Sequence, residues 1–324
     1  MSVKFSFRAG QKAGLRPKKP KAVATGAYVE TFSPASPGSD LKTEQGIREL
    51  RQLGFAVENV QPLRPEGYFA ADTDSRRREF LGLLARPDIA ALFAVRGGYG
   101  SNYLLDGIEK HDFGTPKCVV GYSDLTTLQV YLWQRHGWVA LHGPMVAAGL
   151  HAGDGAPNGY DRASLLEALT NAAGGWNVEL RGVAMAAGRT EGRVLGGAMT
   201  IVEATLGTPW ELQTEDSILL LEDRGMKPYQ VDRVLMHLKQ AGKLAGVRGI
   251  ILGEFPECDP PVSGSPTVRE VCERILGPLR IPIVFGAAIG HTQRPMLTIP
   301  LGVRARLNAE GEGTIEFLES AVTS

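Results

Sequence analysis

Short apolar runs alternate with amphipathic stretches through the first half of the chain. Apolar runs bounded by turn residues are typical of buried strands, and an apolar position every three or four residues is typical of a helix with one buried face. Strands are predicted at residues 22–32, 55–60, 91–95 and 117–121, and helices at 41–53, 74–84, 101–105 and 124–135. Strand followed by helix, repeated, predicts an α/β fold with a parallel sheet that helices cover on both faces.

A segment rich in Gly, Ala, Pro and Asn, at residues 149–158, separates this half from a less regular second half. Beyond it the pattern predicts a helix at 163–171, irregular strands up to 192, strands at 218–221, 249–252 and 283–285, helices at 231–241 and 268–276, and antiparallel strands over 296–317. We therefore expect an N-terminal domain at 22–150 and a C-terminal domain at 151–324. Residues 1–21 are basic and lack the apolar stretch of a secretory signal, which predicts a flexible leader.

Composition narrows the class of protein. The chain has 324 residues with 35 basic and 35 acidic side chains, so nothing favours a nucleic-acid partner. No apolar run reaches the ~18 residues of a membrane span. The three cysteines, Cys118, Cys258 and Cys272, are too scattered for a disulfide framework or a zinc site, which indicates reduced thiols and a cytoplasmic protein.

The strongest local signal is Gly121-Tyr122-Ser123-Asp124, between an apolar strand and a helix. A serine on a sharp strand-to-helix turn exposes its hydroxyl, and the positive end of the helix dipole favours negative charge there, as nucleophilic attack on an amide requires. Serine and aspartate are also favoured helix N-caps. The tetrapeptide by itself fits the cap better than the nucleophile.

A second turn, Arg96-Gly97-Gly98-Tyr99-Gly100, also follows a strand and opens a helix. Its glycines allow backbone N–H groups to converge on one point, as an oxyanion hole or a phosphate cradle requires. A dinucleotide fingerprint would need a third glycine where Tyr103 stands. Both glycine-bearing turns lie at the carboxyl ends of parallel strands, where crevices form in open α/β sheets.

A base and an orienting acid would complete a hydrolytic site. His142 and His291 each follow an apolar strand, and position alone leaves them nearly equal as candidate bases. Glu222 and Asp223 end another apolar strand, although acids are also common where strands meet solvent. The sequence contains no H-E-x-x-H, no paired C-x-x-C and no Walker loop, so metalloprotease and nucleoside triphosphatase functions have no support.

Taken together and in order, these segments resemble the LD-carboxypeptidase family, which also contains the microcin-immunity serine peptidases. The resemblance runs from about Ala27 to Val303. The matching segments are Ser33–Pro37, Ala94–Gly100, Val120–Thr126, Leu141–Pro144, Leu195–Gly197, Leu206–Pro209, Leu221–Asp223 and Gly290-His291.

The resemblance implies a role for each site residue. Ser123 would be the nucleophile, Glu222 the orienting acid and His291 the base, chosen over His142 because of the family pattern. It also implies an oxyanion hole built by the backbone N–H groups of Gly97, Gly98 and Asp124, and substrate-binding roles for Arg96, Tyr99 and Tyr122. Arginine suits a substrate carboxylate, although Arg96 fits a structural salt bridge equally well. The implied fold has the site between an N-terminal parallel domain and a smaller C-terminal α/β domain, with no metal or organic cofactor, in a homodimer.

The implied substrate is a murein tetrapeptide with a free carboxylate, from which terminal D-alanine is released at an L,D-amide during cell-wall recycling. The microcin-immunity type, which cuts the amide of a peptidyl or aminoacyl nucleotide, is the alternative. Trp176 and Trp210 are then the candidates to stack on adenine, although core packing fits each of them better. A catalytically silent module that binds a small anion is the third hypothesis. Many relatives carry Asn-Leu where this chain has Ala198-Met199, which puts the substrate in doubt more than the chemistry.

Overall fold

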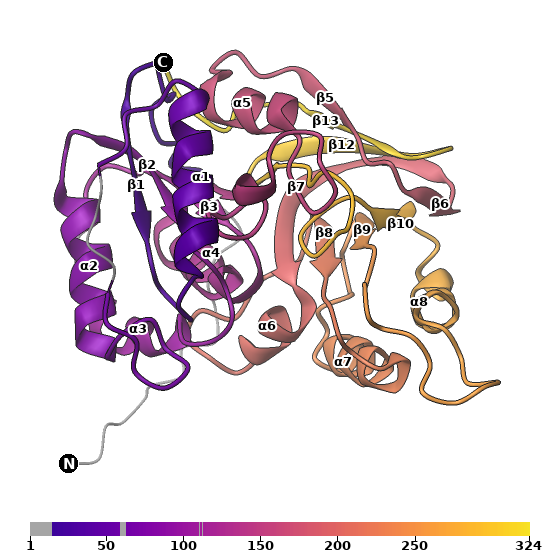
Figure 1. Ribbon diagram of the computed structural model, residues 1–324. Helices are drawn as coiled ribbons and strands as arrows, with labels where there is room; N and C mark the ends of the chain where they lie inside the picture. The colour runs from indigo at the N-terminus through magenta and orange to yellow at the C-terminus, as the bar shows by residue number, and fades with distance from the viewer. Residues whose placement is uncertain (1–14, 59–62, 110, 112) are drawn as a thin grey trace.

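Two separate sheets form the framework of the structure (Figure 1), and one buried cluster holds side chains from both. The structure is a computed structural model and describes residues 15–58, 63–109, 111 and 113–324. In the first sheet, of order β1-β2-β3-β4-β11, the first four strands run parallel and β11 is antiparallel to β4. These strands are β1 (Tyr28–Phe32), β2 (Ile89–Ala94), β3 (Cys118–Gly121), β4 (Ala140–His142) and β11 (Ile299–Leu301).

Helices cover both faces of this sheet, as the alternation of strands and helices predicts. Leu50 of α1 (Asp40–Gln52) packs with Phe93 and Val120 on one face, which α1 covers in Figure 1. The neighbouring positions Leu92 and Val119 point to the opposite face, because side chains alternate along a strand. The helices on that face are α2 (Thr73–Ala85), α3 (Asn102–Ile108) and α4 (Thr126–His136).

The second sheet has eight strands in the order β5-β13-β12-β7-β8-β9-β10-β6. Strands β7 to β10 run parallel, and the outer pairs are antiparallel. The strands are β5 (Trp176–Glu179), β6 (Val183–Ala186), β7 (Gly188–Ala198), β8 (Ser217–Glu222), β9 (Gly249–Gly253), β10 (Ile283–Ala287), β12 (Arg304–Ala309) and β13 (Thr314–Phe317). This sheet is the wider of the two, although the resemblance implies a smaller C-terminal domain.

One face of the second sheet carries helices, and the other continues the core of the first sheet. Leu219 and Leu221 pack against α7 (Pro228–Gln240) and α8 (Val268–Leu276), whereas Leu220 joins the same buried cluster as Val120 of β3. Two more helices complete this part: α5 (Arg162–Thr170) and α6 (Met199–Ala204). The carboxyl ends of β3, β4 and β8 therefore meet where the two sheets join.

Several predicted elements differ from the structure. The strand predicted at 55–60 is wrong, because Ala56 makes a single bridge to Tyr28 and residues 59–60 lie outside the described residues. Helix α6 is absent from the sequence-based prediction, as is the pairing of β11 with the first sheet. Residues 1–14 of the predicted leader are outside the described part, while Lys18 and Lys21 bridge to Trp138 and Thr323.

The remaining global predictions concern thiols and membranes. All three cysteines are buried and unpaired with one another, in agreement with the prediction of free thiols. Among the residues that the structure describes, no helix combines the length and apolarity that a bilayer crossing needs. The described residues also contain no group of three or more His, Cys, Asp or Glu side chains arranged to hold a metal ion.

Candidate active site

Ser123 stands on a strained turn at the end of β3. The buried strand ends at Gly121, and Ser123 then adopts φ +63°, in the left-handed region that non-glycine residues rarely occupy. A short 3-10 turn over Ser123–Leu125 leads into α4. Backbone strain of this kind costs about 1–3 kcal/mol and clusters at functional sites.

Neither Ser123 nor Asp124 caps the helix. The N-cap position of α4 is Leu125, and no side chain caps either the 3-10 turn or the helix. The carboxylate of Asp124 instead accepts the backbone N–H of Ser101 at 2.8 Å, which ties the glycine turn to the serine turn. The cap interpretation, which the tetrapeptide alone favoured, is therefore wrong.

The glycine turn at residues 96–100 lies directly against Ser123. A Cβ atom added to Gly97 would come within 2.8 Å of Ser123 Oγ, so glycine alone permits this approach. Gly98 has φ +104° and packs on Ser36, whose backbone N–H donates to the carbonyl of Gly97 at 3.2 Å. Within the described part of the chain, the N–H groups of Gly97 and Gly98 donate to no backbone acceptor.

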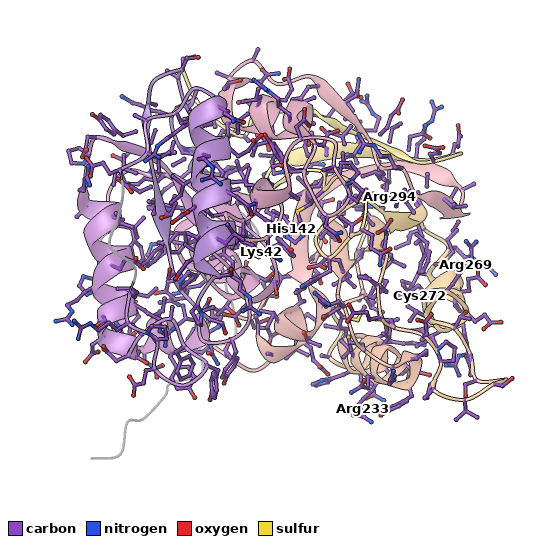
Figure 2. The ribbon with its side chains drawn as sticks, in the orientation of Figure 1. Lys42, His142, Arg233, Arg269, Cys272 and Arg294 are labelled. Atoms are coloured by element: carbon purple, nitrogen blue, oxygen red, sulfur yellow. The ribbon has the colours of Figure 1, made fainter. Side chains whose placement is uncertain are left out.

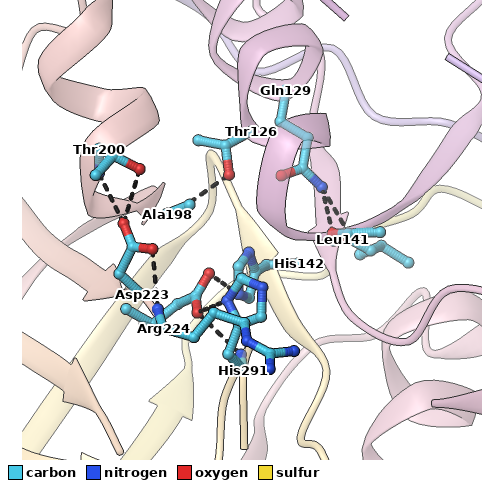
Figure 3. Close-up of polar contacts among 11 residues, drawn as sticks. Thr126, Gln129, Leu141, His142, Ala198, Thr200, Asp223, Arg224 and His291 are labelled. Carbon is cyan, nitrogen blue, oxygen red and sulfur yellow. Dashed lines mark hydrogen bonds and ion pairs between the residues drawn. The ribbon is translucent and has the colours of Figure 1, made fainter. Parts of the chain in front are cut away.

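Glu222, the last residue of β8, forms a buried pair with His291, which Figure 3 labels. The Nδ1 atom of His291 lies 2.7 Å from Oε2 of Glu222, and the backbone N–H of His291 donates to the same oxygen at 2.9 Å. Glu222 is fully buried, and the side chain of His291 is 12% exposed. The sequence-predicted acid and base are thus in contact.

The charges of this pair support each other. Burial opposes the charged form of Glu222, but the neighbouring His291 ring and its N–H groups outweigh this and lower the carboxyl pKa. Burial likewise works against a charged His291, yet the Glu222 carboxylate prevails and raises the pKa of the imidazole. The pair therefore favours a negative Glu222 beside a ring that readily accepts a proton.

His142 has a different environment from His291. It is fully buried, and burial lowers the pKa of its imidazole to about 4 against the opposing charge of Glu222. Its Nε2 atom lies 3.9 Å from Oε1 of Glu222, beyond hydrogen-bond range. The two histidines, nearly equal by sequence position, thus differ in two ways. His142 is fully buried, and only His291 is within hydrogen-bond distance of Glu222.

Tyr122 links the serine turn to both histidines. Its ring centroid lies 5.0 Å from that of His291 and 6.1 Å from that of His142, edge-on in each case. The side chain is buried, and burial together with the charge of Glu222 raises the pKa of its hydroxyl. The side chain of Tyr122 therefore packs beside the two histidines and is not an exposed contact for substrate.

Arg96 and Tyr99 are exposed on the glycine turn, at the rim of the candidate active site. Arg96 is exposed and donates to the carbonyl of Pro37 at 3.2 Å, and among the described residues no carboxylate lies within ion-pair distance of it. The salt-bridge alternative for Arg96 therefore has no partner in the described chain. Tyr99 is 42% exposed and packs edge-on against Tyr103.

A cavity of about 370 Å³ opens beside this rim between the two parts of the chain. Tyr99, Tyr103 and Asp124 line it from one side and Trp210 from the other. Trp176, in contrast, is buried against Phe317 with ring centroids 4.5 Å apart, so it is a core residue.

Comparison with known proteins identifies the family. Residues 29–143 match the LD-carboxypeptidase N-terminal domain, and residues 191–307 match the LD-carboxypeptidase C-terminal domain. The chain is 32% identical over 307 residues to a probable murein peptide carboxypeptidase of Bacillus subtilis, covering 92% of this chain and 94% of the relative. This chain belongs to the LD-carboxypeptidase family.

Two further proteins are similar to this chain. The microcin C7 self-immunity protein MccF of Escherichia coli is 26% identical over 325 residues, which cover 90% of this chain and 93% of MccF. The crystal structure of a muramoyltetrapeptide carboxypeptidase from Oxalobacter formigenes superposes with a TM-score of 0.78 at 26% identity, covering 92% of this chain and all of that one. Both are LD-carboxypeptidase relatives with an α/β fold like this one.

Some supporting residues escape sequence reasoning, because their partners lie far away along the chain. Thr126 Oγ1 accepts the backbone N–H of Ala198 at 3.0 Å, joining the start of α4 to the end of β7. Asp223, which follows Glu222 directly, accepts hydrogen bonds from both the backbone N–H and the hydroxyl of Thr200 (Figure 3). Ala198, the position where the resemblance implies asparagine, is buried and lies opposite Glu222 in the sheet register.

Proposed function

We propose that this chain is a serine-type LD-carboxypeptidase that releases terminal D-alanine from murein tetrapeptides by hydrolysing an L,D-amide bond. The observation that carries the proposal is the Glu222–His291 pair, held within ring contact of Tyr122, the residue immediately before Ser123. Relatives named as murein peptide carboxypeptidases support the substrate class.

In the proposed reaction His291 acts as base through Nε2, because Nδ1 is engaged with Glu222. The ring removes the Ser123 proton, the serine oxygen attacks the amide carbon, and a tetrahedral oxyanion forms. The N–H groups of Gly97, Gly98 and Asp124 would stabilise that oxyanion, each donor contributing about a hundredfold or more to turnover. His291 then protonates the departing D-alanine amine, and water releases the acyl group by the same steps.

Recognition of the free carboxylate falls to Arg96 in this proposal. It is exposed at the start of the glycine turn, and within the described residues it has no competing carboxylate. A guanidinium can hold a carboxylate through two parallel hydrogen bonds, which would distinguish a chain end from an internal residue. We also propose the homodimeric state and the cytoplasmic location that the resemblance and the free thiols imply.

The experiment that tests the function compares D-alanine release from a murein tetrapeptide by the wild type and by Ser123→Ala. We expect release by the wild type and a loss of about 10⁴-fold or more in the variant, as for other nucleophile deletions. A Ser263→Ala variant serves as control, because Ser263 is exposed and precedes α8, away from the serine turn. Release that survives Ser123→Ala would exclude Ser123 as nucleophile.

The second candidate substrate is a peptidyl or aminoacyl nucleotide, as in the microcin-immunity type. The observation in its favour is Trp210, a partly buried aromatic side chain that lines the same cavity as Tyr99, where a base could stack. Its test is the same enzyme with an aminoacyl sulfamoyl adenosine. Cleavage of this compound without D-alanine release from the tetrapeptide would favour the nucleotide substrate over murein.

A further inference from the structure

Two buried polar atoms face each other across the junction of the two sheets without a hydrogen-bond partner. Oε1 of Glu222 and Nε2 of His142 are 3.9 Å apart, and both side chains are fully buried. Within the described chain neither atom has a hydrogen-bond partner, and Nδ1 of His142 has none either, although Oε2 of the same carboxylate has two. An unsatisfied buried polar atom costs about 1–3 kcal/mol, so this pair needs a physical explanation.

The strands fix His142 to the nucleophile turn. His142 ends β4 and pairs in register with Gly121, two residues before Ser123. The side-chain amide of Gln129 donates to the carbonyls of Gly121 at 2.8 Å and Leu141 at 3.0 Å, which binds the ends of β3 and β4 together. Figure 2 shows His142 near the centre of the molecule, where the two sheets meet.

Glu222 belongs to the other sheet and is also tightly confined. It ends β8, and added Cβ atoms at Gly253 and Gly290 would lie 2.7 Å from its Cβ and 2.2 Å from its Cδ. The His142–Glu222 approach therefore spans the junction between the serine-bearing sheet and the sheet that carries the acid. A contact at this point would set the distance between the nucleophile and the acid–base pair.

We propose that His142 is a positioning residue that donates its Nε2–H to Oε1 of Glu222 and so aligns the Glu222–His291 pair with Ser123. The inference rests on the proposed function and names a further residue on which it depends. A closure of about 1 Å brings the 3.9 Å separation to the usual hydrogen-bond length. The Oε2 atom of the carboxylate then remains free to hold His291.

A neutral histidine suits this role better than a charged one. His142 is uncharged near neutral pH, because burial lowers the pKa of its imidazole to about 4. A neutral imidazole still has one N–H donor, so it can satisfy Oε1 without adding a second positive charge beside His291. The negative charge of Glu222 then remains available to stabilise the imidazolium that forms on His291 during the reaction.

Three substitutions separate donation from packing. In His142→Gln the side-chain amide nitrogen can reach the position of Nε2, in His142→Asn it stops near the position of Nδ1, and His142→Leu removes the donor at similar volume. We expect the leucine and asparagine variants to lose about 10–100-fold in kcat, as outer partners of catalytic groups do, and the glutamine variant to recover most of it. KM should change by no more than about twofold, because His142 is fully buried and offers substrate no exposed surface.

Two results would overturn the proposal. One is a leucine variant with wild-type kcat. The other is a glutamine variant as impaired as the leucine variant while both melt at the wild-type temperature, which would assign His142 a packing role. Wild-type release of D-alanine in the same assay shows that the proposed function itself holds.

A second measurement needs no substitution at His142 and no activity. In protein labelled with ¹⁵N-histidine, we expect the His142 ring to be the Nε2–H tautomer, with a downfield proton resonance that shifts upfield in Glu222→Gln. An Nδ1–H tautomer, or a resonance unaffected by Glu222→Gln, would disprove the hydrogen bond. This measurement remains decisive even if the wild type releases no D-alanine.

Discussion

His291 uses both its ring and its backbone to hold one oxygen of Glu222, with Nδ1 at 2.7 Å and the main-chain nitrogen at 2.9 Å. The Nδ1 contact engages that ring nitrogen with the carboxylate, so Nε2 is the ring nitrogen that Oε2 of Glu222 does not hold. The arrangement depends on Gly290, which precedes His291 with φ +56° and lies against the carboxylate.

The first prediction concerns that glycine. A Cβ atom at residue 290 would lie 2.2 Å from Cδ and 2.5 Å from Oε2 of the fully buried Glu222, so the carboxylate would have to shift. Gly290→Ala should therefore displace the carboxylate and lower kcat by about a hundredfold or more, since a shift of about 1 Å in a catalytic group can cost that much.

Gly286→Ala is the matched control for backbone strain. Gly286 also has positive φ, at +76°, but an added Cβ would meet no atom within 4 Å. We expect this variant to lose about 1 kcal/mol of stability and to keep its activity. Equal activity losses in the two alanine variants would mean that strain, and not displacement of Glu222, causes the defect.

The second prediction is a pH profile. The proposed base must be neutral to accept a proton, and the Glu222 carboxylate raises the pKa of His291 above its usual 6.5 despite burial. The value of kcat/KM for D-alanine release should therefore increase with pH, and the midpoint of that increase should lie above pH 6.5. In Glu222→Gln the opposing charge is gone and burial remains, so the residual activity should have a lower midpoint. A wild-type midpoint at or below 6.5 would contradict the assignment.

Much of the first sheet could be predicted because its elements are local and strongly patterned. The strand predicted at 117–121 and the structure's β3 differ by one residue, and α2 extends one residue beyond the predicted helix at each end. The predicted strand at 55–60 failed because alternation of apolar residues cannot show whether a pairing partner exists. Helix α6 and the pairing of β11 with the first sheet escaped prediction, because short elements and their pairing depend on tertiary contacts more than on propensity.

The site could be predicted only as far as strand ends allow. Sequence position places Ser123, Glu222 and both histidines at the carboxyl ends of apolar runs, but register decides which side chains meet. The choice between His142 and His291 needed the resemblance, since both follow apolar strands. The confinement of Glu222 by Gly253 and Gly290 depends on contacts between strands that are distant along the chain.

The third prediction concerns Arg96 and the substrate carboxylate. If this guanidinium binds the free chain end, the wild type should prefer a tetrapeptide acid over its C-terminal amide, and Arg96→Ala should remove the preference. A charge-assisted hydrogen bond contributes about 1.5–3 kcal/mol, which corresponds to roughly a 10–150-fold loss in kcat/KM for the acid. Arg78→Ala, at an exposed position of α2, is the control. Unchanged discrimination in Arg96→Ala would assign carboxylate recognition to another residue.

The last prediction concerns Glu79 of α2, whose Oε2 accepts the backbone N–H of Ser33 at 2.8 Å. Burial raises the pKa of this carboxyl from 4.5 to about 7. Because the folded state holds the proton more tightly than the unfolded state, ionisation destabilises the fold, and the penalty develops between pH 4.5 and 7. Glutamine keeps the acceptor for Ser33 without the charge.

Glu79→Gln should therefore be more stable than the wild type by about 1–3 kcal/mol at pH 8 and nearly equal to it at pH 4, since each unit between two pKa values corresponds to about 1.4 kcal/mol. Chemical denaturation at the two pH values measures the difference. Glu44→Gln, at an exposed position of α1, should show no such pH dependence. If Glu79→Gln and Glu44→Gln changed the free energy of unfolding equally at pH 8, the Glu79 carboxyl would not have the raised pKa assigned to it.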